Sequence, residues 1–271
     1  MQGIQTLIPA PAKLIALSKN GSLYVVSASK AFQDRDQYRA EKSWWNWMFG
    51  TDAGVDFVEL QADGGLKRGE KWTGVSAGSH HVLAVTNKGR TFSLPLSPAG
   101  NSHRQLGTRQ VFETPFPIAS SSAAAAVLSP SLPPESDIRF ETKLTEIASL
   151  KGLEVAQVAS SDRTSLARTP TGRVLGWGAN ESGQIGLGSN AAVEMITVPV
   201  EVVLARNYPG GTHLKCTDVK AGGQMTFFTV ERTMAGKEPA VDLLACGNGM
   251  SGSLGNGLWS SACGVPTKVK T

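Results

Sequence analysis

The residue types that most often perform catalysis or bind metals are sparse in this sequence, and their spacing forms no complete site. The 271 residues include four histidines and three cysteines. His213 and Cys216 have a spacing that occurs in zinc sites, but a structural zinc ion takes four ligands and no second pair accompanies them. Ser160, Ser161 and Asp162 lack the strand–turn–helix context of a serine nucleophile. The sequence therefore predicts no catalytic residue and no metal ligand.

A glycine-rich segment, Gly249–Gly255, resembles a phosphate-binding loop in its glycine spacing. It lacks the Lys-Ser/Thr pair with which a P-loop holds phosphate and magnesium, and no helical pattern follows it. Its glycines have another explanation, because the same glycine spacing occurs earlier in the chain. We therefore expect a protein that is not an enzyme and that has no cofactor and no small-molecule substrate.

Two glycine-rich stretches of the chain align residue for residue, the first over 177–188 and the second over 246–257. The aligned pairs are Trp177 with Cys246, Gly178 with Gly247, Gly183 with Gly252, Ile185 with Leu254, Gly186 with Gly255, and Gly188 with Gly257. A repeat of this length is typical of propellers and other arrays. We expect both stretches to adopt one conformation, with Trp177 as a packing residue because Trp and Cys share no chemistry.

Three predicted β-hairpins share a second register. Their turns contain Gly21, Gly89 and Gly172, each between two runs of strand-forming residues. The first turn has the Asn-Gly sequence that favours a tight hairpin. A fourth, longer hairpin is expected around Arg232–Val241. The pattern predicts an all-β protein with four repeats of antiparallel strands, and helices only in insertions.

The chain also resembles a known family. The residues Trp-Gly-x-Asn-x-x-Gly-Gln-Ile-Gly-x-Gly at 177–188 are similar to the signature of the RCC1-type repeat, named after the regulator of chromosome condensation. The run Val75–His81 is similar to the start of a blade in that family. The resemblance implies an RCC1-type β-propeller, with about four blades of a seven-bladed ring in this chain, and a hydrogen-bonded structural role for His81. Residues before Met1 and after Thr271, or another chain, would then complete the ring.

Composition narrows the possible classes further. The formal net charge is +4 and the basic residues are scattered, so no nucleic-acid partner is predicted. The sparse cysteines indicate no disulfide framework, and no run of about 18 apolar residues predicts a membrane span. We expect a single, partial propeller domain over residues 1–271.

Two insertions interrupt the repeats. Residues 116–137 form a Ser/Ala/Pro low-complexity segment that we interpret as a spacer. Residues 30–50 combine a charged half with an aromatic half. The aromatic half contains the candidate partner- or membrane-binding residues Trp44, Trp45, Trp47, Met48 and Phe49. Three interpretations stay open: the rings cap the propeller or line a groove between blades, they contact a membrane surface, or they anchor a protein partner.

The long first insertion and the irregular early repeats are most similar to those of the fungal mitochondrial RCC1-like proteins. That resemblance implies a non-catalytic scaffold for protein–protein interaction, associated with the mitochondrial inner membrane and acting in assembly of respiratory complex III. The alternative is a guanine-nucleotide exchange factor for a small or dynamin-like GTPase, in the nucleus or cytoplasm. The expected partner is a protein, either an assembly client or a GTPase, with a possible contact to a membrane surface.

Overall fold

The structure, a computed structural model, describes residues 3–11, 13–27, 58–97, 99–108, 143–188 and 193–270. The insertions expected at 30–50 and 116–137 lie outside the described residues. The strands of the described part are β1 (Ile4–Ala10), β2 (Lys13–Ser18), β3 (Leu23–Ser27), β4 (Val58–Ala62), β5 (Trp72–Ala77), β6 (His81–Thr86), β7 (Thr91–Pro95), β8 (Lys143–Glu146), β9 (Gln157–Ser160), β10 (Thr164–Arg168), β11 (Val174–Ala179), β12 (Met195–Glu201), β13 (His213–Gly222), β14 (Met225–Met234), β15 (Lys237–Gly247) and β16 (Cys263–Lys268).

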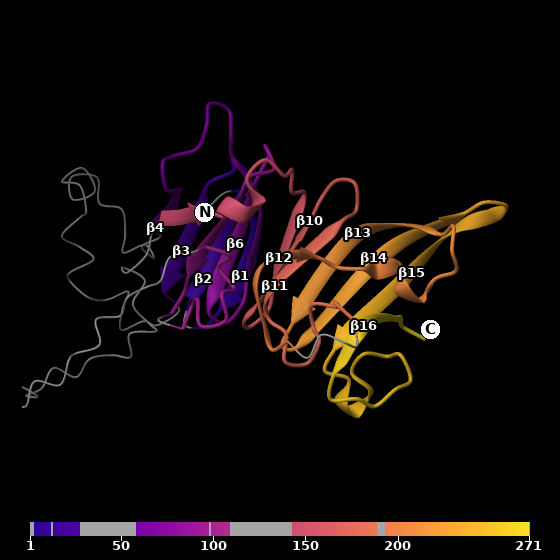
Figure 1. Ribbon diagram of the computed structural model, residues 1–271. Helices are drawn as coiled ribbons and strands as arrows, with labels where there is room; N and C mark the ends of the chain where they lie inside the picture. Colours follow the sequence, from indigo (N-terminus) through magenta and orange to yellow (C-terminus); the bar gives the residue numbers. More distant parts are fainter. Residues whose placement is uncertain are drawn as a thin grey trace, which may run out of the picture.

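These strands form four antiparallel meanders, which we call blades 1 to 4: β1–β4, β5–β8, β9–β12 and β13–β16. Blades 1 and 2 are joined at their outer edges by a short parallel pairing of β4 with β8. The first strands of consecutive blades, β1, β5, β9 and β13, contact one another in turn. Figure 1 shows the blades side by side in chain order, from indigo to yellow. The prediction of an all-β protein with four repeats of antiparallel strands is confirmed.

Short helices occur where the sequence did not predict them. In the described part they are the 3-10 helices η3 (Ala148–Leu150), η4 (Leu204–Asn207) and η5 (Met250–Gly252). The expectation that helices occur only in insertions is therefore wrong for these segments. Each lies in a loop that must reverse within a few residues, and i to i+3 hydrogen bonds suit such tight reversals.

Hydrophobic side chains fill the junctions between adjacent blades. Blades 1 and 2 share a cluster in which Trp72 and Phe92 meet edge to face, with ring centroids 5.0 Å apart. The cluster between blades 2 and 3 contains the fully buried Trp177. The cluster between blades 3 and 4 contains Phe228 and Cys246. The alternation of buried residues along each strand thus feeds two neighbouring junctions, as expected for stacked sheets.

The predicted hairpin glycines hold consecutive blades together. All three have positive φ angles, between 73° and 88°. The carbonyl of each accepts a hydrogen bond from a backbone N–H at the start of the next blade. The pairs are Gly21 with Trp72, Gly89 with Val155, and Gly172 with Cys216, each at an N···O distance of 3.1 Å. A Cβ atom at these glycines would collide with the next blade, so the turn requires glycine for conformation and for space.

The aligned glycines of the two stretches all have positive φ angles, as expected for one shared conformation, although the second stretch departs at Ser251, which has a φ of 58° inside η5. Gly178 and Gly247 both have positive φ angles, 97° and 113°, and at each a Cβ would collide with the backbone carbonyl of a neighbouring loop. Trp177 is fully buried, and its Nε1 donates to the Gln105 carbonyl of blade 2 at 2.8 Å. Cys246 repeats this contact, since its Sγ donates to the carbonyl of Gln184 in blade 3 at 3.3 Å. Trp177 is therefore a packing residue that also bridges two blades.

Candidate functional site

The residues predicted to bind a partner or membrane, Trp44, Trp45, Trp47, Met48 and Phe49, lie outside the described residues, and their role stays a prediction. Over the described ranges no group of three or more His, Cys, Asp and Glu residues is arranged to hold a metal ion. His213 is exposed, whereas Cys216 is buried and donates to the Asp218 carbonyl at 3.2 Å. Within the same ranges no helix is both long and apolar enough to cross a bilayer.

A cavity of about 430 Å³ lies at the junction of blades 2 and 3. The start of β7 forms one wall and the loop from β8 to β9, which includes η3, forms the opposite wall. The apolar side chains of its lining are buried or half-buried, whereas its lysines are exposed. The lining residues are Lys67, Lys88, Arg90, Thr91, Glu146, Ile147, Leu150, Lys151, Gly152, Leu153 and Glu154. The hollow therefore lies between a strand of blade 2 and the loop that connects blade 2 to blade 3.

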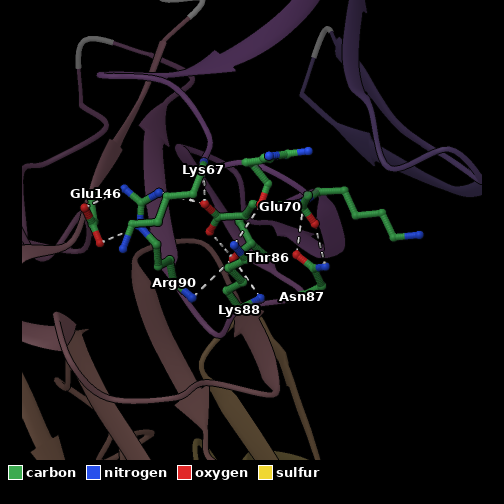
Figure 2. A network of polar contacts seen from close by, with 10 residues as sticks. Lys67, Glu70, Thr86, Asn87, Lys88, Arg90 and Glu146 are labelled. Atoms are coloured by element: carbon green, nitrogen blue, oxygen red, sulfur yellow. Dashed lines mark hydrogen bonds and ion pairs between the residues drawn. The ribbon is translucent and has the colours of Figure 1, made fainter.

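Arg90 is the cation of this cavity with the most side-chain hydrogen bonds. Its Nε and Nη2 donate to the two carboxylate oxygens of Glu146 at 2.9 and 2.8 Å. Its Nη1 donates to Glu70 at 2.9 Å, so the guanidinium bridges two carboxylates, as Figure 2 shows. Hydrogen bonds from Arg90 hold the pKa of Glu146 below its usual range, and the same bonds raise the pKa of Arg90. The Arg90 charge is thus permanent and fixed in position.

Glu70 anchors this network inside the protein, with no exposed side-chain surface. Thr86 Oγ1 donates to one of its oxygens at 2.6 Å, and the Lys67 backbone N–H donates to the other at 2.8 Å. Burial by itself raises the pKa of Glu70, but these hydrogen bonds and Arg90 outweigh burial and lower it. Glu70 is therefore charged at neutral pH, and it fixes the hairpin that carries Arg90.

One hydroxyl and two ammonium groups of the lining lack a hydrogen-bond or ion-pair partner among the described residues. Thr91 is only 2% exposed, and its hydroxyl has no hydrogen-bond partner in the described part. Lys67 and Lys151 form no side-chain hydrogen bond or ion pair with any described residue, although Glu146 attracts both ammonium groups at longer range. Lys88 donates to the carbonyl of Arg68 at 2.9 Å. The cavity thus combines two ammonium groups without a direct partner and an unused hydroxyl.

A second, smaller hollow of about 280 Å³ opens at the opposite end of the blades, lined by loops of blades 2, 3 and 4. Ser79 donates to Asp162 there, and His80 contacts Ser97. His81, behind these loops, is fully buried, and its Nε2 lies 2.7 Å from the Ser165 hydroxyl of blade 3. Burial lowers the pKa of His81 to about 3. The predicted structural role of His81 agrees with this geometry.

Sequence analysis overlooked an exposed apolar group on the loop after β15. Trp259 is 77% exposed, Leu258 57% and Met250 53%. The indole of Trp259 lies beside the η5 turn, because a Cβ added to Gly252 would be 3.8 Å from Nε1. The sequence did contain an indication of this group, because Trp259 follows a glycine-rich stretch and does not belong to a predicted strand.

Comparison with known proteins identifies the repeat. A model described as "Regulator of chromosome condensation (RCC1) repeat" matches residues 171–229, and a second model of that description matches residues 155–184. The chain is 28% identical over 214 residues to Protein FMP25, mitochondrial, of Saccharomyces cerevisiae, which covers 76% of this chain and 34% of that protein. It is 30% identical over 122 residues to Protein pim1 of Schizosaccharomyces pombe, covering 45% of this chain and 18% of that protein.

Comparison with solved structures supports the same fold. The crystal structure of Prp20p from Saccharomyces cerevisiae superposes with a TM-score of 0.57 at 15% sequence identity, covering 100% of this chain and 51% of that one. At this identity the likeness shows the fold alone. The chain spans about a third of FMP25 and about half of Prp20p. The predicted resemblance to RCC1-type repeats is confirmed.

Proposed function

We propose that this chain is a non-catalytic propeller scaffold for protein–protein interaction. The observation that carries the proposal is the exposed apolar group of Met250, Leu258 and Trp259 on the loop of blade 4. Aromatic side chains of this kind anchor protein interfaces, and large exposed apolar groups on a protein surface generally have a use. The RCC1-type fold and the similarity to FMP25 support a role in protein interaction.

The proposed place of action is the mitochondrial inner membrane, where the scaffold assists assembly of respiratory complex III. The similarity to FMP25, a protein named as mitochondrial, supports the compartment. The run of Trp44, Trp45, Trp47, Met48 and Phe49 follows basic residues of the same insertion. Tryptophan beside Lys and Arg favours the surface of anionic bilayers. In this proposal these aromatic residues dock the propeller to the membrane, and the loop of blade 4 is left for a client protein.

Flotation with cardiolipin-containing vesicles tests the membrane contact. Wild-type protein is expected to float with the vesicles, and a variant with Trp44, Trp45 and Trp47 all replaced by Ser is expected to stay behind with an unchanged thermal melt. Trp259→Ser is the matched control, because it removes an exposed indole from another loop and should float normally. If the triple variant unfolds, its rings belong to the core and the membrane contact is wrong.

The role in assembly has a separate test in mitochondria that lack the chain. Wild-type protein should restore the amount of assembled complex III on native gels. Trp259→Ser should restore less, although it still reaches the membrane. Normal complex III in the complete absence of the chain would contradict the assembly role.

The alternative, a guanine-nucleotide exchange factor, is favoured by one feature. The β14–β15 hairpin extends away from the other blades (Figure 1), and a Cβ added to its turn glycine, Gly236, would have no neighbouring atom within 4 Å. Prp20p, which has the same fold, is reported with binding properties to Gsp1p and histones. Release of a fluorescent GDP analogue from Gsp1p should accelerate with wild-type protein and not with a variant lacking residues 233–238. Identical release rates for both proteins would remove this alternative for Gsp1p.

A further inference from the structure

One position of the repeat departs from its counterparts at the cavity between blades 2 and 3. The residue two places after the hairpin glycine is Leu23 in blade 1 and Val174 in blade 3, and both are fully buried. In blade 2 it is Thr91, which is 2% exposed and whose buried hydroxyl has no hydrogen-bond partner in the described part. A buried hydroxyl without a partner destabilises the fold, whereas an apolar residue of similar shape does not. A bound ligand that accepts a hydrogen bond from Thr91 explains the departure.

The charge of the lining indicates what that ligand is. The charged residues of the lining are Lys67, Lys88, Arg90, Lys151, Glu146 and Glu154. Four cations against two carboxylates leave a formal excess of two positive charges in the lining. Arg90 pairs with Glu146 in the lining and with Glu70 behind the lining, so its charge is already compensated. Lys67 and Lys151, which form no ion pair with a described carboxylate, supply the excess. Ammonium groups that have no direct internal partner are available to a dianion.

We infer that this cavity binds a small phosphate monoester, with the phosphate held by Lys67, Lys151 and the Thr91 hydroxyl. A phosphate monoester is largely dianionic at neutral pH and has three strong acceptor oxygens, which match two ammonium groups and one donor hydroxyl. The organic part of the molecule lies on the apolar floor of Ile147 and Leu150. The volume of about 430 Å³ exceeds that of a phosphate ion and suits a small organic molecule.

The Arg90 network gives this site a fixed wall. Because Arg90 is hydrogen-bonded to Glu70 and Glu146, it keeps the β6–β7 hairpin and the end of β8 in place. It does not need to bind the ligand to do so. Such preorganisation lowers the entropy that binding must overcome. The ligand is bound and not converted, since the described lining contains no nucleophile beside a base. The site does not rest on the scaffold function, because its residues differ from those proposed to contact membrane or client.

Calorimetric titration with glycerol 3-phosphate, at constant ionic strength adjusted with KCl, tests the inference. Wild-type protein should bind with one-to-one stoichiometry. The double variant Lys67→Gln/Lys151→Gln should bind at least about tenfold more weakly, because two charge-assisted contacts are lost. The control, Lys237→Gln, removes an exposed lysine of blade 4 and should bind as wild type does.

Substitutions of Thr91 separate a binding role from a structural one. Thr91→Val should weaken binding while the thermal midpoint stays the same or rises, since valine is the residue of blade 3 at this position. Thr91→Ser keeps a hydroxyl and should retain most of the affinity. A structural role for Thr91 would instead lower the thermal midpoint in the valine variant.

Two further arms identify the source of the phosphate. Flotation with vesicles that contain phosphatidic acid, lost in Lys67→Gln/Lys151→Gln and kept in Lys237→Gln, would assign the monoester to a lipid headgroup. Binding of glycerol 3-phosphate alone would assign it to a soluble molecule. The inference is overturned if neither arm shows binding, if glutarate binds as tightly as glycerol 3-phosphate, or if Lys237→Gln weakens binding as much as the double variant.

Discussion

The junction of blades 2 and 3 and the junction of blades 3 and 4 are built on the same repeat positions but differ in character. Between blades 3 and 4, Val174 is buried among apolar side chains, and the Arg173–Glu201 pair lies at the surface with both side chains about half exposed. Between blades 2 and 3, Thr91 replaces the valine and the equivalent arginine, Arg90, is 18% exposed. The backbone frame of the repeat therefore tolerates either a closed apolar contact or a polar hollow.

The difference arises from a few side chains, because the hairpin glycines and the inter-blade hydrogen bonds are the same at both junctions. Leu153 occupies in blade 3 the position that Glu70 occupies in blade 2, so Arg173 has a single carboxylate partner where Arg90 has two. Conserving the frame while changing a pair of side chains is how a repeat protein acquires a site in one repeat only. Equivalent substitutions at the two junctions should therefore have unequal effects.

The largest expected effect concerns the residue that bridges each junction. Trp177→Ala should lower the free energy of unfolding by about 3–5 kcal/mol, since it leaves a large cavity and removes the bond to Gln105. Cys246→Ala, the equivalent change between blades 3 and 4, removes one sulfur and should lower it by about 1 kcal/mol. Urea unfolding of both variants checks the contrast. Equal losses would mean that Trp177 does not pack as described.

The next effect concerns the two arginines. Arg90→Leu leaves Glu70 buried with its charge unpaired, and should lower the free energy of unfolding by about 3 kcal/mol. Arg173→Leu breaks a pair that water already screens, and should change the stability little. Adding Glu70→Leu to Arg90→Leu should recover part of the loss. A larger loss in Arg173→Leu than in Arg90→Leu would contradict the contrast.

The sequence alone was sufficient for the repeat and insufficient for the cavity. Gly89, Gly172 and Gly178 are local requirements, because each needs a positive φ angle where another backbone passes, so their spacing reports the fold directly. Lys67 and Lys151 are 84 positions apart, in the loop before β5 and the loop after β8, and only the folded chain brings both to one cavity. No local pattern encodes that meeting. Alignment of the hairpin glycines shows in the sequence that Thr91 replaces an apolar residue of the other repeats. Its burial and its unpaired hydroxyl could be seen only in the structure.

A smaller expected effect is a pH dependence of the free energy of unfolding, which arises from His81 at the junction of blades 2 and 3. His81 bridges to Ser165 of blade 3, and its pKa falls from an ordinary 6.5 to about 3 on folding. The unfolded chain therefore binds a proton that the folded chain does not, and stability is lost as the pH falls below about 6.5, by up to about 1.4 kcal/mol per unit. The equivalent residue of blade 3, Thr164, does not titrate.

Comparison of wild type with His81→Gln between about pH 4.5 and 7.5 isolates this contribution from that of the carboxylates. The difference in the free energy of unfolding between the two proteins should narrow as the pH falls, because only wild type loses the His81 contribution. A difference that stays constant with pH would show that folding does not change the pKa of His81.

The measurement closest to the central claim exchanges the residues of the two junctions at their equivalent position. Val174→Thr places an unpaired hydroxyl in a filled apolar contact and should lower the free energy of unfolding by about 1–3 kcal/mol. Thr91→Val should leave it unchanged or raise it by up to about 1 kcal/mol in the absence of ligand. Urea unfolding of both variants in phosphate-free buffer gives the answer. If Thr91→Val destabilises the protein as much as Val174→Thr does, the hydroxyl serves the fold and the two junctions are alike.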